Sequence, residues 1–596
     1  MNNNISQNTG TVTKLLHYIG AQKKKLAIVF FLVILVTILN LWAPIELGKI
    51  IDFISNDISK VLSGSQGGNF EFKTSAFGES VAFLVAIYLL AFALNYVGDY
   101  IMAAVSEEVA LKMRKDLSAK LNRLPLNFYD SRQKGDILSR ATNDIEKVAE
   151  SLREGLVQLL RVFTTVTGAV ILMFYIYPIL ALVSIGVIIC TSIVAYFISK
   201  RSRTEFSNYQ KSLGEINGNI EEAFTGQLII KAFNHEQQAI DDFEKINATV
   251  YKTAYKSQIA IYMVPPVARI IGDIGYATVA VISGYAVIQG RLTIGTVQAF
   301  IQYLYKSSEP IIEGAYILNT MQSAIAASKR LFEVLDECDE IHDTPSASLA
   351  TAKGLVEFKN VKFGYTEDKV LMRNVNICLN AGDKVAIVGP TGAGKTTLVN
   401  LLMRFYEIQG GTISVDGIDI RTLSRDSLRS NFGMVLQDTW LFEGTIRDNI
   451  AYSNLNASEE EIMKAAYSAH ADHFIRTLPQ GYQTIVNDDN TTLSQGQKQL
   501  LTIARVVLAN PSILILDEAT SSVDTRTEQE IQNAMDNLMK GRTSFVIAHR
   551  LSTIRNANLI LVMNNGNIIE QGTHEQLLAQ KGFYSDLYNS QFTSTI

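Results

Sequence analysis

The first 335 residues are dominated by apolar runs long enough to cross a lipid bilayer. The first, Leu26 to Ala43, follows Lys23-Lys24-Lys25 and is too long for the core of a cleavable signal peptide. Five further runs lie near 80–104, 155–176, 178–198, 258–287 and 294–322. Because the bilayer core offers no partners for backbone polar groups, we expect six membrane-spanning helices in domain 1–335.

Lysine and arginine placement orients these helices. Both long connections, 106–153 and 199–257, are rich in the two residues, whereas the other connections carry few. The positive-inside rule therefore places both termini and both long loops in the cytoplasm, on a multi-pass protein of the cell membrane. Apolar residues of the first loop recur at helical spacing, at Met113, Leu117, Leu121 and Leu124. We therefore expect the spanning helices to continue into the cytoplasm.

The character of the chain changes near residue 336. Segment 336–354 is acidic and then rich in Pro, Ser and Thr, which predicts a linker. From 355 to 596, short β-like runs alternate with helical patterns, which predicts an α/β domain around a mainly parallel sheet. The net charge of -5 argues against a nucleic-acid partner. Its three cysteines lack the spacing of a disulfide framework or a zinc site.

The strongest motif of the second domain is Gly389-Pro-Thr-Gly-Ala-Gly-Lys-Thr396. It follows the strand-like run KVAIV and precedes a helical segment, as a phosphate-binding loop requires. Lys395 is expected to reach the β- and γ-phosphates of ATP, and Thr396 to bind Mg²⁺. The other expected nucleotide contacts in this segment are Gly389, Thr391, Gly392, Ala393, Gly394 and Thr397.

A second motif is the run Ile513-Leu-Ile-Leu-Asp517-Glu518. A buried strand that ends in an acid places Asp517 beside the metal, and Glu518 next to the attacking water as its base. The alternative is an ordinary strand followed by a surface acidic pair. The glycine-rich loop in the same domain favours the catalytic interpretation.

Leu493-Ser494-Gln495-Gly496-Gln497 resembles the signature sequence of the ABC ATPases, and the other elements of that family occur in order. The resemblance implies that Tyr365 stacks on adenine, that Gln437 lies near the metal and the water, and that His549 contacts the γ-phosphate. The resemblance also implies that Asp524 belongs to the D-loop of that family, which follows the catalytic acid. The membrane half is similar to six-helix exporters of that family, with 128–144 and 221–236 matching their coupling loops.

In that family the signature closes over the nucleotide of a partner domain. The resemblance therefore implies that Ser494, Gly496 and Gln497 contact ATP bound by a second half-transporter. Two departures concern the partner: Gln495 replaces the usual first glycine, and Val486–Asn490 replaces a glycine- and arginine-containing run. Both resemble the hydrolysis-competent half of heterodimeric bacterial multidrug exporters. We therefore favour a heterodimer, in which Lys395 and Glu518 serve the active site; a homodimer is the alternative.

The expected function is ATP-driven export of small hydrophobic or amphipathic compounds of the multidrug type by alternating access. Alternatives are a lipid or peptide exporter of the same architecture, or an ATP-gated channel or sensor. Ionisable residues in or near the apolar runs are candidate substrate contacts: Asp99, Arg161, Asp273, Lys306, Glu309 and Glu313. Acidic residues would favour lipophilic cations, unless the charges pair with each other.

Overall fold

The computed structural model describes residues 2–62, 74–341, 343, 347–366, 369–437, 439–486, 493–517, 524–548 and 551–592. The chain divides into two compact units. The first comprises Met1–Asn122 and Arg132–Cys338, and the second comprises Arg123–Ser131 and Asp339–Ile596. The second unit therefore includes a short piece of the first cytoplasmic loop, which the predicted boundaries 1–335, 336–354 and 355–596 do not separate.

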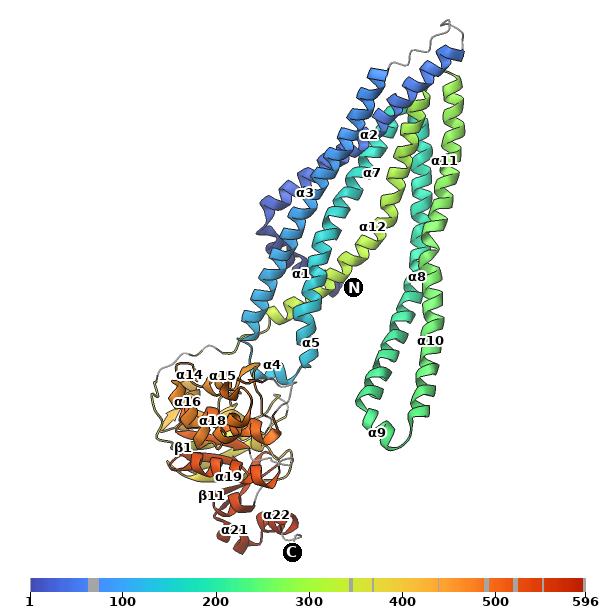
Figure 1. The fold of residues 1–596 in the computed structure, drawn as a ribbon. Helices are drawn as coiled ribbons and strands as arrows, with labels where there is room; N and C mark the ends of the chain where they lie inside the picture. The colour runs from blue at the N-terminus through green and yellow to red at the C-terminus, as the bar shows by residue number, and fades with distance from the viewer. Residues whose placement is uncertain are drawn as a thin grey trace. The chain divides into compact units, whose positions relative to one another are not determined.

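The first unit is built of long helices (Figure 1). They are α1 (Asn2–Gly20), α2 (Lys23–Leu62), α3 (Thr74–Leu121), α7 (Val157–Ile176), α8 (Pro178–Thr225), α9 (Gln227–Ala232), α10 (Glu236–Tyr262), α11 (Val264–Ile288) and α12 (Ile294–Leu335). Five stretches of the described chain are long and apolar enough to cross a membrane: Lys23–Ile58, Phe77–Leu121, Lys134–Ile176, Pro178–Thr225 and Glu236–Ile288. The sixth predicted span, on α12, is not among them and stays a prediction.

Two helices continue far beyond their apolar runs, as predicted. α3 extends to Leu121, and α8 extends to Thr225 before the chain returns through α9 and α10 (Figure 1). Met113 and Leu117 of α3 are fully buried, which confirms this part of the predicted apolar face. The helix ends at the half-buried Leu121, so Leu124, although buried, does not continue that face. The run 258–287, predicted as one span whose ends Pro265 and Pro266 leave uncertain, is divided at Met263. The interruption coincides with Pro265 and Pro266, which lack backbone N–H groups and favour the first turn of a new helix.

Helical segments of varied type lead from the first loop into α7. They are α4 (Leu126–Asp130), α5 (Lys134–Ser139), the π-helical η1 (Arg140–Asp144), α6 (Ile145–Glu150) and the π-helical η2 (Ser151–Leu156). Asp144 is almost fully buried and accepts two bonds from Arg330 of α12, from Nε at 2.9 Å and from Nη2 at 2.5 Å. This bidentate pair connects the π-helical path to the cytoplasmic end of α12.

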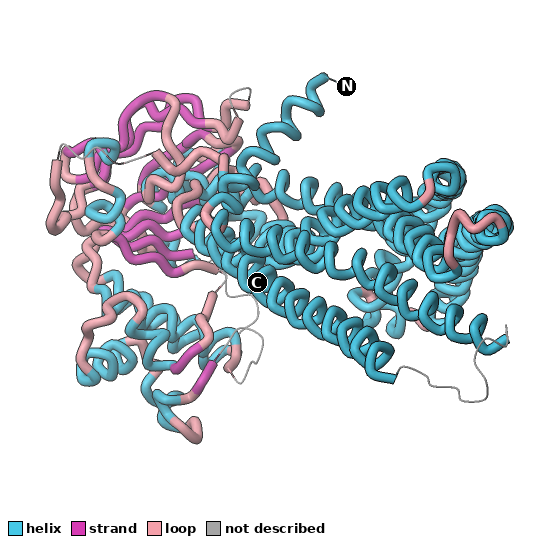
Figure 2. The backbone as a smooth tube through the Cα atoms, turned by 90° about the horizontal axis from the view of Figure 1, so that it is seen from above, coloured by secondary structure: helices cyan, strands magenta, loops and turns pink. Residues whose placement is uncertain are grey.

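The second unit contains three sheets, seen as the strand-rich part of Figure 2. One orders β2 (Met372–Leu379), β1 (Val356–Phe363), β4 (Gly410–Val415) and β5 (Ile418–Asp419). A larger one orders β12 (Asn567–Gly572), β11 (Leu559–Asn564), β3 (Lys384–Val388), β10 (Thr543–Ile547), β9 (Ile513–Asp517) and β6 (Phe432–Val435). β7 (Gly444–Thr445) pairs with β8 (Ile485–Val486). Strands β11, β3, β10, β9 and β6 are parallel, which confirms the predicted α/β architecture.

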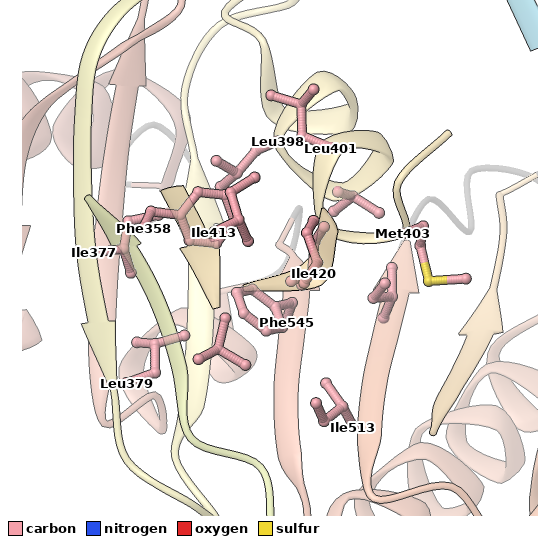
Figure 3. Packing of buried hydrophobic residues seen from close by; sticks show 14 of the residues in the cluster. Phe358, Ile377, Leu379, Leu398, Leu401, Met403, Ile413, Ile420, Ile513 and Phe545 are labelled. Atoms are coloured by element: carbon pink, nitrogen blue, oxygen red, sulfur yellow. The ribbon is translucent and has the colours of Figure 1, made fainter. Parts of the chain in front are cut away.

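Helices surround these sheets and complete the core. They are α13 (Lys395–Leu402), α14 (Arg425–Arg429), α15 (Ile446–Ala451), α16 (Glu459–Ser468), α17 (Asp472–Thr477), α18 (Gln495–Ala509), α19 (Thr525–Met539), α20 (Leu551–Arg555), α21 (His574–Gln580) and α22 (Phe583–Phe592), with 3₁₀ turns η3 (Ile420–Thr422) and η4 (Gly481–Gln483). Figure 3 shows Phe358, Leu398 and Phe545 in one buried cluster, so the first sheet, α13 and the large sheet share a core. Parallel strands covered on both faces explain the continuous apolar runs of β3 and β9.

The predicted linker segment is held by a network of buried charges within the second unit. The Asp343 carboxylate accepts from the Arg425 backbone N–H at 2.6 Å, from Arg425 Nη1 at 2.5 Å and from Arg404 Nη1 at 3.3 Å. Glu407 Oε1 accepts from the same two guanidinium groups, at 2.9 Å and 2.8 Å. The arginine side chains are 8% and 6% exposed, so both depend on these carboxylates for charge compensation, and Arg425 depends also on Glu340 at 2.9 Å.

Candidate nucleotide-binding site

The register of the large sheet brings the predicted motifs to one edge. Ile547 of β10 pairs with Ile387 of β3 on one side and with Asp517 of β9 on the other. β6 lies beside β9 and ends two residues before Gln437. Since these strands are parallel, the loops that follow them emerge at the same carboxyl edge, where open α/β sheets bind ligands.

Positive φ angles shape the phosphate-binding loop. Gly392 and Gly394 have φ angles of 82° and 98°, a backbone region that residues with a side chain rarely adopt. At Gly389 a Cβ atom would lie 2.3 Å from the Met563 carbonyl oxygen, so glycine is needed there for space. Gly566 donates its N–H to the Ala393 carbonyl at 2.9 Å, which fixes the loop against the β11–β12 turn. The loop thus presents backbone N–H groups at the start of α13, where an anion is favoured.

Lys395, the first residue of α13, reaches back across its own loop. Its Nζ donates to the carbonyl of Gly389 at 2.8 Å and to that of Pro390 at 3.1 Å. Burial lowers the pKa of the Lys395 amine, and the charge of Asp517 acts in the opposite direction. The two carbonyls offer the Lys395 amine only the negative ends of dipoles. A polyphosphate bound in the loop would offer it full negative charge and hence stronger, charge-assisted hydrogen bonds.

A hollow of about 850 Å³ gathers most of the predicted residues. Those that line it are Tyr365, Thr391, Gly392, Ala393, Gly394, Lys395, Thr396, Thr397, Gln437 and Asp517. Residues that the sequence did not indicate also line it: Thr366, Lys369, Val370, Leu371 and Ile547. A hollow of similar size, about 860 Å³, lies between α16, α17 and α19 and contains none of the predicted residues. The chemistry of its lining therefore makes the first hollow the candidate nucleotide site.

Tyr365 lines the hollow, and two further aromatic rings, Phe363 and Tyr406, pack against it. The Tyr365 hydroxyl lies 2.8 Å from Thr397 Oγ1, and the Tyr365 ring meets Tyr406 edge-on at 5.2 Å. Phe363 packs against both rings. Tyr406 donates its hydroxyl to the carboxylate of Asp130, at the end of α4. Burial and this carboxylate raise the pKa of the Tyr406 phenol, so it remains a donor.

Neither Asp130 nor Tyr406 was predicted to have a role at the site. One sequence feature could have indicated Tyr406: the aromatic pair Phe405-Tyr406 lies directly after the helix that follows the phosphate-binding loop.

The signature residues do not line this hollow. Ser494 begins α18 and forms a capping box with Gln497: its hydroxyl accepts from the Gln497 backbone N–H, and the Gln497 side chain accepts from the Ser494 backbone N–H. Gly496 is buried in the first turn of α18. Asp524 caps α19, and the Thr527 N–H holds the pKa of the Asp524 carboxyl below its usual range. Two predicted catalytic residues, Glu518 and His549, lie outside the described residues.

The oxygen groups of the hollow fit a magnesium ion bound with a nucleotide. Thr396 contributes a hydroxyl, Asp517 a carboxylate and Gln437 an amide oxygen, and all three line the hollow. Hard oxygen ligands of this kind suit Mg²⁺, which completes its shell with water and phosphate oxygens.

The ionisable candidates of the membrane part have different partners among the described residues. Arg161 Nη2 donates to Asn95 Oδ1 at 2.8 Å and lies 3.8 Å from Asp99, so these two charges pair with each other. Asp273 lies beside Tyr305. Lys306 donates to a backbone carbonyl, as described below. The side chains of Glu309 and Glu313 lie outside the described residues.

Comparison with known proteins agrees with this geometry. Residues 26–305 match the family model of the ABC transporter transmembrane region, and residues 372–521 match the family model described as ABC transporter. A fatty acid ABC transporter ATP-binding/permease protein of Mycobacterium bovis is 44% identical over 89% of this chain and 84% of its own. A putative multidrug export ATP-binding/permease protein of Bacillus subtilis is 36% identical over 98% and 99%.

A solved structure extends the likeness to three dimensions. A bacterial Atm1-family ABC exporter with ATP bound matches at a TM-score of 0.75 and 27% identity, covering 96% of this chain and 98% of that one. The chain is thus a multi-pass membrane protein with a cytoplasmic, ATP-binding ATPase domain. It belongs to the ABC transporter family, as an exporter half-transporter that fuses one transmembrane region to one ATPase domain.

Proposed function

We propose that this half-transporter exports hydrophobic or amphipathic compounds of the multidrug type, and that its own phosphate-binding loop serves a hydrolytic site. The observation that carries this proposal is the single hollow that contains Tyr365, Lys395, Gln437 and Asp517 in a chain that also carries long apolar helices. Such a combination couples a nucleotide site to a membrane path.

Each part of the hollow has a role in holding ATP. The Tyr365 ring stacks on adenine, and its contact with Tyr406 fixes the ring's orientation. The loop N–H groups bind the phosphates, and Lys395 exchanges its carbonyl partners for β- and γ-phosphate oxygens. Mg²⁺, held by Thr396, Asp517 and Gln437, neutralises phosphate charge when bound.

Hydrolysis requires a base beside the γ-phosphate. Glu518 follows the last residue of β9 and takes a proton from the attacking water, which Gln437 orients. His549 follows β10, the strand between those of Asp517 and the phosphate-binding loop, and contacts the γ-phosphate. These roles make phosphate release the step that ends closure.

A partner ATPase domain completes the site. Ser494, Gly496 and Gln497 do not line this chain's hollow, which supports their proposed contact with ATP held by the partner, with Asp524 at the shared interface. The exposed second coupling loop supports the same conclusion, because Phe224 and Leu228 are 84% and 79% exposed around α9. ABC half-transporters dimerise. Gln495 and the run before it favour a different chain as partner, and in such a heterodimer Ser494 caps the weaker site.

Closure of the two ATPase domains around ATP, and reopening after hydrolysis, would move the long cytoplasmic helices. These two states would expose a central path through the membrane first to one side and then to the other. A second candidate class of cargo is lipid, because the relative that is 44% identical is named for fatty acids.

Inside-out vesicles test this proposal. We expect dye uptake with Mg-ATP, none with a non-hydrolysable analogue, and none in Glu518→Gln. Undiminished uptake in Glu518→Gln would refute the catalytic role of Glu518. Robust uptake by this chain alone would contradict the heterodimer. ATP-dependent dye equilibration without accumulation against a gradient would indicate a gated channel instead.

A further inference from the structure

Pro44 interrupts the hydrogen bonding of α2 inside its apolar run. Proline lacks a backbone N–H, so the carbonyl four residues earlier, that of Asn40, loses its helical partner. In a membrane an unpaired carbonyl is costly, and a neighbouring helix must satisfy it. Lys306 of α12 does so, because its Nζ donates to the Asn40 oxygen at 2.8 Å.

The surroundings of this contact are apolar. One turn before Lys306, the fully buried Tyr303 donates its hydroxyl to the Leu41 oxygen at 2.5 Å. Tyr303 and Leu41 belong to a cluster with Phe300, Leu304 and residues of α7. Lys306 therefore lies against the spanning part of α2, half-buried between helices.

The charge of Lys306 is not compensated by the described residues. An ammonium group has three N–H donors, and among the described residues only one donor of Lys306 has a partner, the neutral Asn40 carbonyl. No described carboxylate lies within 4 Å of its Nζ, whereas Arg161 is paired with Asp99. An ammonium ion in such surroundings is unfavourable unless an anion accompanies it. A cationic side chain against a spanning helix, without a carboxylate partner among the described residues, points to a ligand.

We propose that Lys306 binds the acidic head group of an amphipathic substrate, while the tail lies along the apolar helices. The two remaining N–H groups can donate to a carboxylate or phosphate, and the Asn40 bond holds the amine in place. This proposal rests on the proposed export function and narrows its substrate class to anionic amphiphiles. The fatty acid relative is consistent with it, since a fatty acid carries such a head group.

Three probes of equal chain length test the proposal: a fluorescent C16 carboxylic acid, its uncharged primary amide, and the corresponding alkyl phosphate. Binding is measured by fluorescence in nanodiscs that contain the full-length exporter without ATP. The variants are Lys306→Met, which keeps much of the side-chain length without charge, and Lys306→Arg, which restores a cation. Lys49→Met is the matched control, because Lys49 is exposed and has Glu46 as its partner.

Lys306→Met should weaken binding of the carboxylic acid about tenfold or more, the loss expected for a charge-assisted bond. Binding of the amide should stay unchanged, Lys306→Arg should recover most of the affinity, and Lys49→Met should resemble the wild type. Comparison of the carboxylic acid with the alkyl phosphate identifies the preferred head group. Equal loss for acid and amide would show that Lys306 only holds α2 and α12 together, and unchanged acid binding would equally overturn the proposal.

The binding readout separates this proposal from that of export. If vesicles show no ATP-dependent uptake but acid binding depends on Lys306, the export proposal fails and the site stands. If uptake occurs and acid binding ignores Lys306, the site fails and export stands. Detergent melting curves exclude misfolding of Lys306→Met as the cause of lost binding.

Discussion

The hydrogen bond between Tyr406 and Asp130 connects the nucleotide hollow to a loop of the transmembrane region. Tyr406→Phe removes only the hydroxyl and keeps the ring that packs against Phe363 and Tyr365 at 5.8 Å and 5.2 Å. A hydrogen bond to a charged group contributes about 1.5–3 kcal/mol when buried. Asp130 is exposed, so we expect about 1 kcal/mol, or a roughly fivefold effect on a rate that depends on the bond.

The assay compares basal ATPase activity with the activity stimulated by a transported compound. Tyr406→Phe should leave basal activity and ATP affinity nearly unchanged, because the Tyr365 ring, which we propose stacks on adenine, is intact. The stimulated rate should fall about fivefold. Asp130→Asn removes the other partner's charge and should have a similar effect. In the double variant the loss should not exceed that of either single variant, since both changes remove one bond. Fully additive losses, or unchanged stimulation in Tyr406→Phe, would refute this coupling.

Three further predictions concern the ATPase domain. Asp343→Ala should destabilise it by about 1–3 kcal/mol, because two nearly buried arginines lose one shared carboxylate while Glu407 still pairs with both. Thermal inactivation of the ATPase measures this loss, and Asp242→Ala, which removes only an exposed pair with Lys245, should leave the midpoint unchanged. Gly389→Ala should abolish binding of a fluorescent ATP analogue, because the new Cβ would meet the Met563 oxygen at 2.3 Å; binding at wild-type affinity would contradict the loop geometry. Burial and Arg555 lower the pKa of His574 from its usual 6.5, so the stability that the neutral imidazole contributes is present above about pH 6.5 and is lost as the pH falls. Between about pH 7.5 and 5.5 the melting temperature should therefore drop less in His574→Gln than in the wild type. Equal drops would exclude this role of His574.

The phosphate-binding loop was predictable because its chemistry is local. Glycines at fixed spacing, a lysine and a threonine between a strand and a helix specify both the backbone conformation and the ligand. The position of Asp517 followed from a buried strand that ends in an acid, whereas that of Gln437 followed only from the family resemblance. Long periodic helices such as α3 were predictable for a similar reason, since the apolar face repeats along the chain.

Contacts between segments far apart in sequence were not predictable. Nothing near Tyr406 indicates that its hydroxyl meets Asp130, because 276 residues separate them. The sequence identifies Lys306 only as an ionisable residue in or near an apolar run. Its bond to Asn40 depends on the helix-breaking effect of Pro44 and on the pairing of α2 with α12, which the sequence pattern leaves open. The break at Met263 shows the opposite case, in which Pro265 and Pro266 already carried the signal.

The central claim is that ATP hydrolysis at the site of this chain drives export. Phosphate release and uptake of a labelled amphiphile, measured together in one preparation of inside-out vesicles, test it most directly. We predict that Glu518→Gln and Lys395→Ala abolish both, whereas a neutral surface change such as Lys245→Gln abolishes neither. Uptake that continues in Glu518→Gln while phosphate release stops would contradict the claim.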